Sequence, residues 1–342
     1  LQGGLVSTAP DVRQLGQAET GDSGLDRLHS LKEGDTVKAR IFRYDPSKDA
    51  EPRYETYEIP YMKWMRVLDV LNHVAEDFEV PMAHRWFCGV KKCGTCAVRV
   101  NGREVLSCWE AAEPEMTIEP LGHLPVVRDL VVDRKGYEDL VLKMAPWLER
   151  GEPYPGFPEH ITDREMARAS LALDCLSCMA CHSACPVLDL GDETRFSGPA
   201  PLVQLAQTAL DPRDTMDRGR IAIEEASIFS CVSCYRCEEV CPTEIPIVSG
   251  VIEPLKALAY RAMPRAARHQ AAFVDIMMKR GRIDPTALVL RTQGAGAFRR
   301  LGRALKLLMH GKIDPVKTLF GSSIPGMDQV RRLHAAFKGK RP

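Results

Sequence analysis

One cysteine pattern occurs twice in this chain and constrains its fold more than any other feature. The pattern reads C-x2-C-x2-C-x3-C-P and covers residues 175–186 and 231–242. This spacing is one with which proteins bind pairs of iron–sulfur clusters, the fourth cysteine of each run reaching the cluster of the other run. The proline prevents the chain from continuing as a helix. Zinc sites and disulfides are the alternatives, but zinc favours two separated pairs of ligands.

The doubled pattern assigns eight cysteines to two cubane clusters. For the first [4Fe–4S] cluster we expect the ligands Cys175, Cys178, Cys181 and Cys241. For the second [4Fe–4S] cluster we expect Cys185, Cys231, Cys234 and Cys237. A [3Fe–4S] cluster at the second site would use Cys185, Cys231 and Cys237. His182, inside the first run, is expected to face solvent rather than to donate to a cluster sulfur.

The other four cysteines follow a different pattern. Cys88, Cys93, Cys96 and Cys108 have the plant-type spacing C-x4-C-x2-C with a distant fourth cysteine, which predicts a [2Fe–2S] cluster. Glycines at 89 and 94 suit a loop that wraps a cluster closely. A zinc site or a lone redox pair is the alternative here. The three clusters together use all 12 cysteines, so none remains as a nucleophile or a disulfide partner.

The hydrophobic pattern places these motifs on a mixed scaffold. Alternation predicts strands at 37–44 and 54–59, helical spacing predicts a helix at 65–78, and Asn-Gly at 101–102 predicts a hairpin. Residues 113–133 are expected to form a last strand, a turn and a connector. Helices are expected at 163–172, 199–210 and 217–228, with Asp163 and Asp217 as caps.

The charge of the chain is distributed unevenly. Lys+Arg and Asp+Glu number 46 each, yet residues 261–342 hold 18 basic and 4 acidic side chains. Residues 298–310 predict a basic amphipathic helix, which could lie on an anionic membrane, dock on an acidic partner or simply be a packed helix with a charged face. No apolar stretch reaches the roughly 20 residues of a membrane span, and residues 1–15 do not resemble a secretory signal. Clustered cysteines then indicate metal binding in a reducing compartment.

Several further stretches resemble one known family. These are FRYDP at 42–46, the C-x4-C-x2-C-x11-C loop, IEPL at 118–121, LPVVRDLVVD at 124–133, GPA at 198–200, DPRD at 211–214 and both cubane runs. They are similar to the iron–sulfur subunit of succinate dehydrogenase and fumarate reductase over residues 36–250. The resemblance implies an α+β fold: an N-terminal β-grasp plant-type ferredoxin domain, an α-helical two-cluster bacterial-ferredoxin-like domain and a helical C-terminal extension.

The expected domain boundaries follow from this resemblance. Residues 1–35 would form a flexible extension, 36–133 the [2Fe–2S] domain, 134–255 the two-cluster helical domain and 256–342 the basic helical extension. The resemblance also implies an FAD-containing flavoprotein partner, a membrane anchor or other acceptor subunit, and a quinone at that interface. The chain would be cytoplasmic, on the inner face of the cell membrane through its partners, with no nucleic acid bound.

Three departures from the family matter. Cys234 stands where the family often has another residue, and a fourth thiolate predicts [4Fe–4S] rather than [3Fe–4S]. Leu190 and Val232 replace the Trp and His of the familiar quinone site, whereas Pro186 remains. The tail is longer than the family pattern, and residues 165–300 are also similar to the small iron–sulfur subunit of heterodisulfide reductase.

Overall fold

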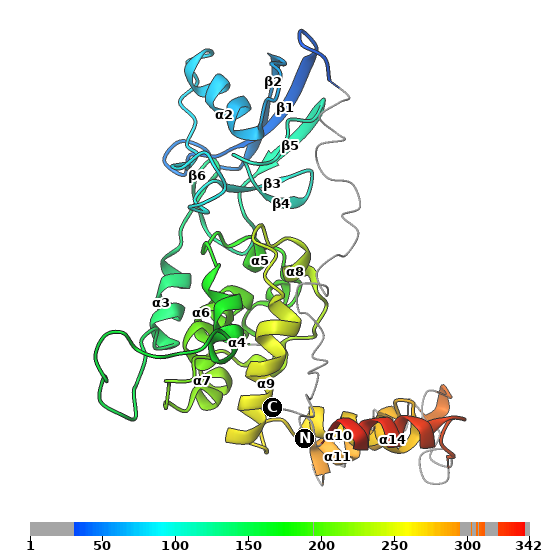
Figure 1. Ribbon diagram of the computed structural model, residues 1–342. Coiled ribbons are helices and arrows are strands. Elements are labelled where there is room, and N and C mark those ends of the chain that lie inside the picture. Colours follow the sequence, from blue (N-terminus) through cyan, green and yellow to red (C-terminus); the bar gives the residue numbers. More distant parts are fainter. Residues whose placement is uncertain are drawn as a thin grey trace, which may run out of the picture. The chain divides into compact units, whose positions relative to one another are not determined.

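A computed structural model shows that the chain divides into two compact units whose segments alternate along the sequence. Figure 1 shows the helices and strands in their order along the chain. The first comprises Leu1–Glu138, Asp174–Asp189 and Tyr235–Ile245, and the second Asp139–Leu173, Leu190–Cys234 and Pro246–Pro342. The structure describes residues 31–193, 195–294, 302, 306, 308–311 and 321–338. Most of the predicted N-terminal extension, 1–35, therefore lies outside the described residues.

A five-stranded mixed sheet forms the centre of the first unit. Its strands are β1 (Thr36–Arg43), β2 (Arg53–Pro60), β3 (Ala97–Val100), β4 (Arg103–Leu106) and β5 (Glu115–Glu119), in the order β2-β1-β5-β3-β4. Strand β1 runs parallel to β5 and antiparallel to β2, and β3 runs antiparallel to β4 and β5. A separate antiparallel pair consists of β6 (Val126–Arg128) and β7 (Val131–Val132). The strand predictions are confirmed to within about two residues.

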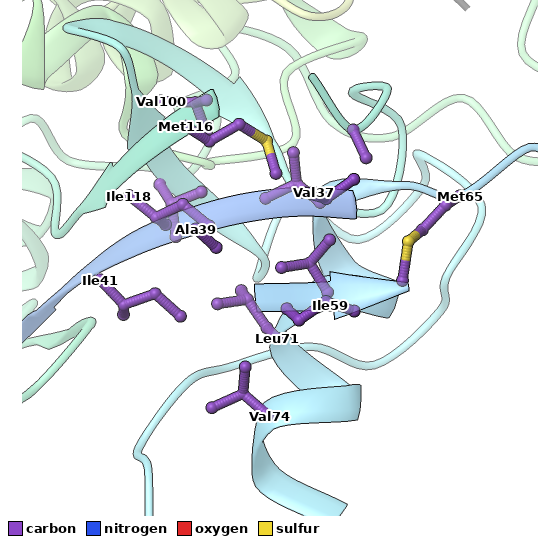
Figure 2. Close-up of a cluster of buried hydrophobic side chains, with 14 of the residues drawn as sticks. Val37, Ala39, Ile41, Ile59, Met65, Leu71, Val74, Val100, Met116 and Ile118 are labelled. Atoms are coloured by element: carbon purple, nitrogen blue, oxygen red, sulfur yellow. The ribbon is translucent and has the colours of Figure 1, made fainter. Parts of the chain in front are cut away.

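Helix α2 (Val67–Glu76) covers one face of the sheet. Every second residue of β1 points to this face, so Val37, Ala39 and Ile41 are fully buried. Figure 2 shows the side chains of Ile59 and Leu71 among the buried residues that join sheet and helix. Full burial of a valine, leucine or isoleucine side chain contributes about 1.5–3 kcal/mol to the stability of the fold. The predicted helix at 65–78 thus forms because its apolar side chains have a sheet to cover.

The tight turn predicted between β3 and β4 is also present. Asn101 and Gly102 have φ angles of 50° and 78°, and both lie in the left-handed region that a two-residue hairpin turn requires. Asn101 also accepts a hydrogen bond from the backbone N–H of Thr117 at 2.8 Å. The turn is therefore held against the neighbouring strand β5, and it fixes the register of the strand that precedes Cys108.

Short and medium helices, joined by loops, follow the sheet in the described chain. They are α3 (Lys135–Lys143), α4 (Asp163–Leu173), α5 (Ala180–Ser183), η2 (Leu188–Glu193), α6 (Pro199–Ala209), α7 (Arg218–Glu224), η3 (Ile228–Ser230), α8 (Arg236–Glu239), η4 (Ile247–Ile252), α9 (Glu253–Ala262), α10 (Arg268–Arg280), α11 (Pro285–Gln293) and α14 (Met327–Lys338). None of them combines the length and the apolar character needed to cross a membrane.

One cap prediction is confirmed and another is wrong. The Asp217 side chain accepts a hydrogen bond from Arg220 N and caps α7 as predicted. Asp163, however, is the first residue inside α4, and the cap is Thr162. Thr162 Oγ1 accepts from Glu165 N at 3.3 Å while Glu165 accepts from Thr162 N at 2.9 Å. This reciprocal pair is a capping box, which satisfies two backbone donors instead of one.

The helices that follow the cysteine runs are separated by glycine and proline. Gly281 ends α10 in the left-handed conformation, with φ of 72°. Asp284 then caps α11 by accepting from Ala287 N at 3.0 Å, and Pro285 is the first helical residue, as predicted. The predicted amphipathic helix at 298–310 lies mostly outside the described residues.

Candidate iron–sulfur centres

The loop from Cys88 to Cys96 directs backbone N–H groups at cysteine sulfurs. Val90 N and Lys92 N donate to Cys88 Sγ at 3.4 and 3.3 Å, and Lys91 N donates to Cys108 Sγ at 3.4 Å. Hydrogen bonds to cluster-binding sulfurs are one of the means by which proteins tune such centres. The loop therefore presents its sulfurs in an environment that favours negative charge.

The four sulfurs of this loop also interact with one another. Burial raises the pKa of Cys93, but hydrogen bonds from Thr95 and from Cys88 outweigh it and lower the pKa to about 6. Burial raises the pKa of Cys108 to about 11, and the neighbouring sulfurs of Cys96 and Cys88 act in the same direction. The structure thus places the sulfur of Cys93 close to Cys88, and the sulfur of Cys108 close to Cys96 and Cys88. Four thiol donors with backbone N–H groups aimed at them suit a [2Fe–2S] cluster.

The two cubane runs share one backbone conformation. Ser177 and Ser233 have φ of 50° and 53°, and Met179 and Tyr235 have φ of 70° and 67°. Each pair of left-handed residues leads into a four-residue helix, α5 or α8, that carries the third cysteine of its run. The repeated sequence spacing is therefore a repeated local structure.

Sulfurs from both runs meet in the first unit. Burial raises the pKa of Cys178 to about 12, and the charges of Cys241 and Cys175 add to this effect. Burial likewise raises the pKa of Cys181 well above its ordinary value, with contributions from the same sulfurs and from Cys237. Cys175, Cys178, Cys181 and Cys241 therefore lie within electrostatic reach of one another. Thiols that repel each other's negative charge suit a site that a multiply charged iron group would occupy.

The cysteines expected at the second cubane belong to different units. Cys185 and Cys237 are in the first unit, and Cys231 and Cys234 are in the second. Cys185 and Cys237 are buried, whereas Cys234 is exposed. Lys256 Nζ donates to Cys231 O at 2.9 Å and to Ser233 Oγ at 3.1 Å, which fixes the start of the second run on α9. This ligand set rests on the sequence spacing.

Two side chains near the runs differ from what the sequence predicts. His182 was expected to face solvent, but it is buried, and burial followed by the charge of His123 lowers its pKa to about 4. Glu104 is buried between the sheet and the first run, where its carboxylate accepts a hydrogen bond from Ser183 Oγ at 2.8 Å. The order of apolar and polar residues along β4 does not predict that Glu104 points inward.

The positions of the familiar quinone site carry apolar side chains. Leu190 and Val232 are 55% and 67% exposed. Neither can donate a hydrogen bond to a quinone oxygen. Arg85 and Trp86, which precede the [2Fe–2S] loop, are also exposed.

Comparison with known proteins places both cysteine patterns in described families. Residues 38–139 match the 2Fe-2S iron-sulfur cluster binding domain, and residues 171–245 match the 4Fe-4S dicluster domain. A fumarate reductase iron-sulfur subunit of Haemophilus influenzae is 29% identical, over 63% of this chain and 90% of its own length. The chain therefore contains both kinds of iron–sulfur domain and is similar to fumarate reductase iron-sulfur subunits over about two-thirds of its length.

Two further relatives extend this result. A subunit of the fumarate reductase (CoM/CoB) of Methanothermobacter marburgensis is 36% identical over 66% of this chain. The chain spans only 45% of the length of that relative. A chain of the Mycobacterium smegmatis Sdh1 complex in the apo form is structurally similar, with a TM-score of 0.60 and 26% identity over 68% of this chain and 98% of its own. In the described ranges, no three His, Cys, Asp or Glu side chains converge on a position for a single metal ion. The preference for iron–sulfur clusters over zinc comes from the two domain matches.

Proposed function

We propose that this chain relays electrons between an FAD-containing flavoprotein subunit and an acceptor in a complex of the succinate dehydrogenase and fumarate reductase type. The observation that carries the proposal is the position of the 12 cysteines, all of which fall within the two matched cluster-binding domains. When bound, the clusters would supply one-electron transfer. Succinate or fumarate chemistry would take place on the partner, so no residue of this chain is proposed to be catalytic.

The proposed ligands are those expected from the sequence spacing. Cys88, Cys93, Cys96 and Cys108 would hold the [2Fe–2S] cluster within a β-grasp domain spanning 36–133. Cys175, Cys178, Cys181 and Cys241 would hold the first [4Fe–4S] cluster, and Cys185, Cys231, Cys234 and Cys237 the third centre, within a domain spanning 134–255. The sulfur environments described above support this assignment for the first two sets.

For the third centre we propose [4Fe–4S]. Cys234 provides the fourth thiol in the second run, and the residue is exposed. An additional thiolate also adds negative charge, which disfavours the reduced state and lowers the reduction potential. This centre would therefore be a poorer oxidant than a three-iron cluster in the same place.

The acceptor is proposed to lie beyond the third centre, on a membrane-anchor subunit or another partner. Such a partner would hold the chain at the inner face of the cell membrane. Leu190 and Val232 lack the hydrogen-bonding groups of the familiar quinone site. A quinone at this interface would then depend on donors from the partner chain.

A second candidate function is electron transfer in a heterodisulfide reductase-like complex. Two observations favour it: the four-cysteine second run, and the similarity to a relative whose name joins fumarate reductase with CoM/CoB. The matched 2Fe-2S domain fits the first candidate better, because that domain is part of the resemblance to the succinate dehydrogenase and fumarate reductase subunits.

Native purification without oxygen tests both candidates. The complex would be isolated from its host, its subunits identified, and its iron, sulfide and flavin measured. A co-purifying FAD subunit, with fumarate or succinate driving oxidation or reduction of this chain's clusters, is the expected result. A cysteine-rich disulfide-reducing subunit without such a flavoprotein would support the second candidate. A chain that contains zinc and no iron would contradict both.

A further inference from the structure

Gly94 brings the [2Fe–2S] loop into direct contact with the first cubane run. A Cβ atom built on Gly94 would lie 2.6 Å from the carbonyl oxygen of Leu176, 2.9 Å from Leu176 Cβ and 3.0 Å from Cys178 Cβ. All three neighbours are backbone or Cβ atoms, so no flexible side-chain end can move aside. The two segments therefore approach each other so closely that a side chain at residue 94 does not fit, and glycine does.

The backbone conformation alone does not explain this glycine. Gly89 and Gly94 have nearly the same φ, +69° and +71°. A Cβ atom on Gly89 would meet nothing within 4 Å. Both positions need a residue that tolerates positive φ, but only Gly94 of the two also needs the absence of a side chain. A substitution at Gly89 therefore measures the effect of the positive φ alone.

The cubane run is held in place on its other sides. Arg134 Nη2 donates to Ser177 O at 2.9 Å. Gly122 N donates to Ser183 Oγ at 2.8 Å, and this hydroxyl donates onward to Glu104. If a side chain were added at residue 94, the run could retreat only by breaking or stretching such bonds.

There is also little free space beside the contact. The cavity next to it, lined by Gly94, Cys178, Met179 and Arg134 among others, has a volume of about 20 Å³. A single water needs about 10–15 Å³. The cavity has room for about one water and offers a displaced loop little space, so an added methyl group must shift the backbone atoms that it meets.

We propose that Gly94 is a positioning residue that sets the spacing between the [2Fe–2S] site and the first [4Fe–4S] site. This inference rests on the proposed function, since it takes Cys93 and Cys178 as ligands of the two clusters. Gly94 follows Cys93 directly, and a Cβ atom built on Gly94 would lie 3.0 Å from Cys178 Cβ. One peptide unit and one close approach of backbone to the cubane run thus lie between the two ligand sets. Electronic coupling between two centres weakens steeply with separation, so the contact favours electron exchange between them.

Two matched substitutions in the full-length chain test this spacing. Gly94→Ala and Gly89→Ala introduce the same methyl group at the same φ, and the wild type gives the reference. After purification without oxygen, iron and sulfide content is measured, and the clusters are reduced together for EPR. The magnetic splitting that each cluster causes in the other falls with the inverse cube of their distance. We expect equal iron in all three proteins, and a smaller splitting in Gly94→Ala alone.

The outcomes separate this inference from the proposed function. A wild type without [2Fe–2S] and [4Fe–4S] signals would contradict the proposed function itself. Equal splitting in Gly94→Ala and Gly89→Ala would overturn only the spacing role. Loss of the [2Fe–2S] cluster in Gly94→Ala alone would also overturn it, because the glycine would then be needed to form that site.

A second comparison applies if Gly94→Ala does not accumulate. Leu176→Gly removes the Cβ atom that lies 2.9 Å away and frees the backbone around the Leu176 carbonyl. The double variant Gly94→Ala/Leu176→Gly should fold and show a smaller splitting than Leu176→Gly alone. Equal splittings in these two proteins would overturn the proposal.

Discussion

Ser183 donates a hydrogen bond to Glu104 across 2.8 Å, in the interior of the first unit and between residues 79 positions apart. Ser183 belongs to α5, within the first cubane run, and Glu104 belongs to β4 of the sheet. The same hydroxyl accepts from Gly122 N. One side chain thus connects the cubane run to two parts of the [2Fe–2S] domain, and the buried carboxylate depends on it.

Replacing Ser183 should therefore destabilise the first unit. Ser183→Ala leaves the Gly122 N–H and the Glu104 carboxylate without this partner, and an unsatisfied buried polar group costs about 1–3 kcal/mol. Chemical denaturation followed by fluorescence measures the change in unfolding free energy. Ser170→Ala is the control, because Ser170 is exposed on α4 and its hydroxyl donates locally, to Ala167 O. Its effect should stay within about 0.5 kcal/mol, and equal effects would contradict the connecting role of Ser183.

Local patterns predicted much of the first unit. The alternation around Val37 and Ile41 was enough to define β1, because one face of a sheet must be apolar. Asn101-Gly102 defined a turn because both residues tolerate positive φ. The cysteine spacing predicted the [2Fe–2S] loop, and the structure directs N–H groups at its sulfurs. These features depend on neighbouring residues only.

The residues that escaped prediction depend on contacts between distant segments. The burial of Glu104 depends on Ser183, which no local pattern connects to it. Gly94 fitted a cluster loop from the sequence, but its contact with Leu176 appears only when the loop meets the cubane run. Arg218 on α7 is 2% exposed and donates to the carbonyls of Met144, Ala145 and Trp147. An arginine in a helix is ordinarily expected on the solvent-exposed face.

A buried ion pair fixes the connector after β5 to the sheet. Asp129 is 2% exposed and accepts from Arg43 Nε at 3.1 Å, Tyr44 N at 3.0 Å and Ala83 N at 2.8 Å. Asp129→Asn should destabilise the first unit by about 1.5–3 kcal/mol, the usual contribution of hydrogen bonds to a charged group, because Arg43 keeps its ion pair with Glu55 at 2.7 Å. The midpoint of urea unfolding measures this loss.

Asp77→Asn is the control for Asp129. The Asp77 carboxylate pairs with His73 but is 61% exposed. Surface pairs of this kind contribute about 0–1 kcal/mol. If Asp129→Asn lowers the free energy of unfolding no more than Asp77→Asn does, the buried pair does not hold the connector to the sheet.

An acid-dependent interaction is expected in the second unit. A hydrogen bond from Arg213, which outweighs the opposing effect of burial, lowers the pKa of Asp211 below its ordinary value. Because the folded-state pKa is lowered, the carboxylate stabilises the fold fully above the ordinary Asp pKa of about 3.9. This contribution is lost as the pH falls through the lowered pKa.

Asp211→Asn should therefore reduce stability at pH 7 and have a smaller effect as the pH falls below about 4. The measurement is the difference in unfolding free energy between wild type and variant across the acid range. Taking the difference cancels the loss of acid-labile clusters that both proteins share. A difference that stays constant with pH would contradict the role of the Asp211 carboxylate.

The last prediction concerns the nuclearity of the third centre. Cys234 supplies the fourth thiolate of the second run, so Cys234→Ala should remove one iron and leave a [3Fe–4S] centre with a raised reduction potential. Mössbauer and EPR spectra of protein purified without oxygen measure both changes, while the signals of the other two clusters should persist. Val232→Ala is the control, because Val232 lies in the same run with a 67% exposed side chain and no metal-binding group. If wild type and Cys234→Ala both contain a stable three-iron centre, Cys234 is not a ligand, and the third centre is [3Fe–4S] held by Cys185, Cys231 and Cys237.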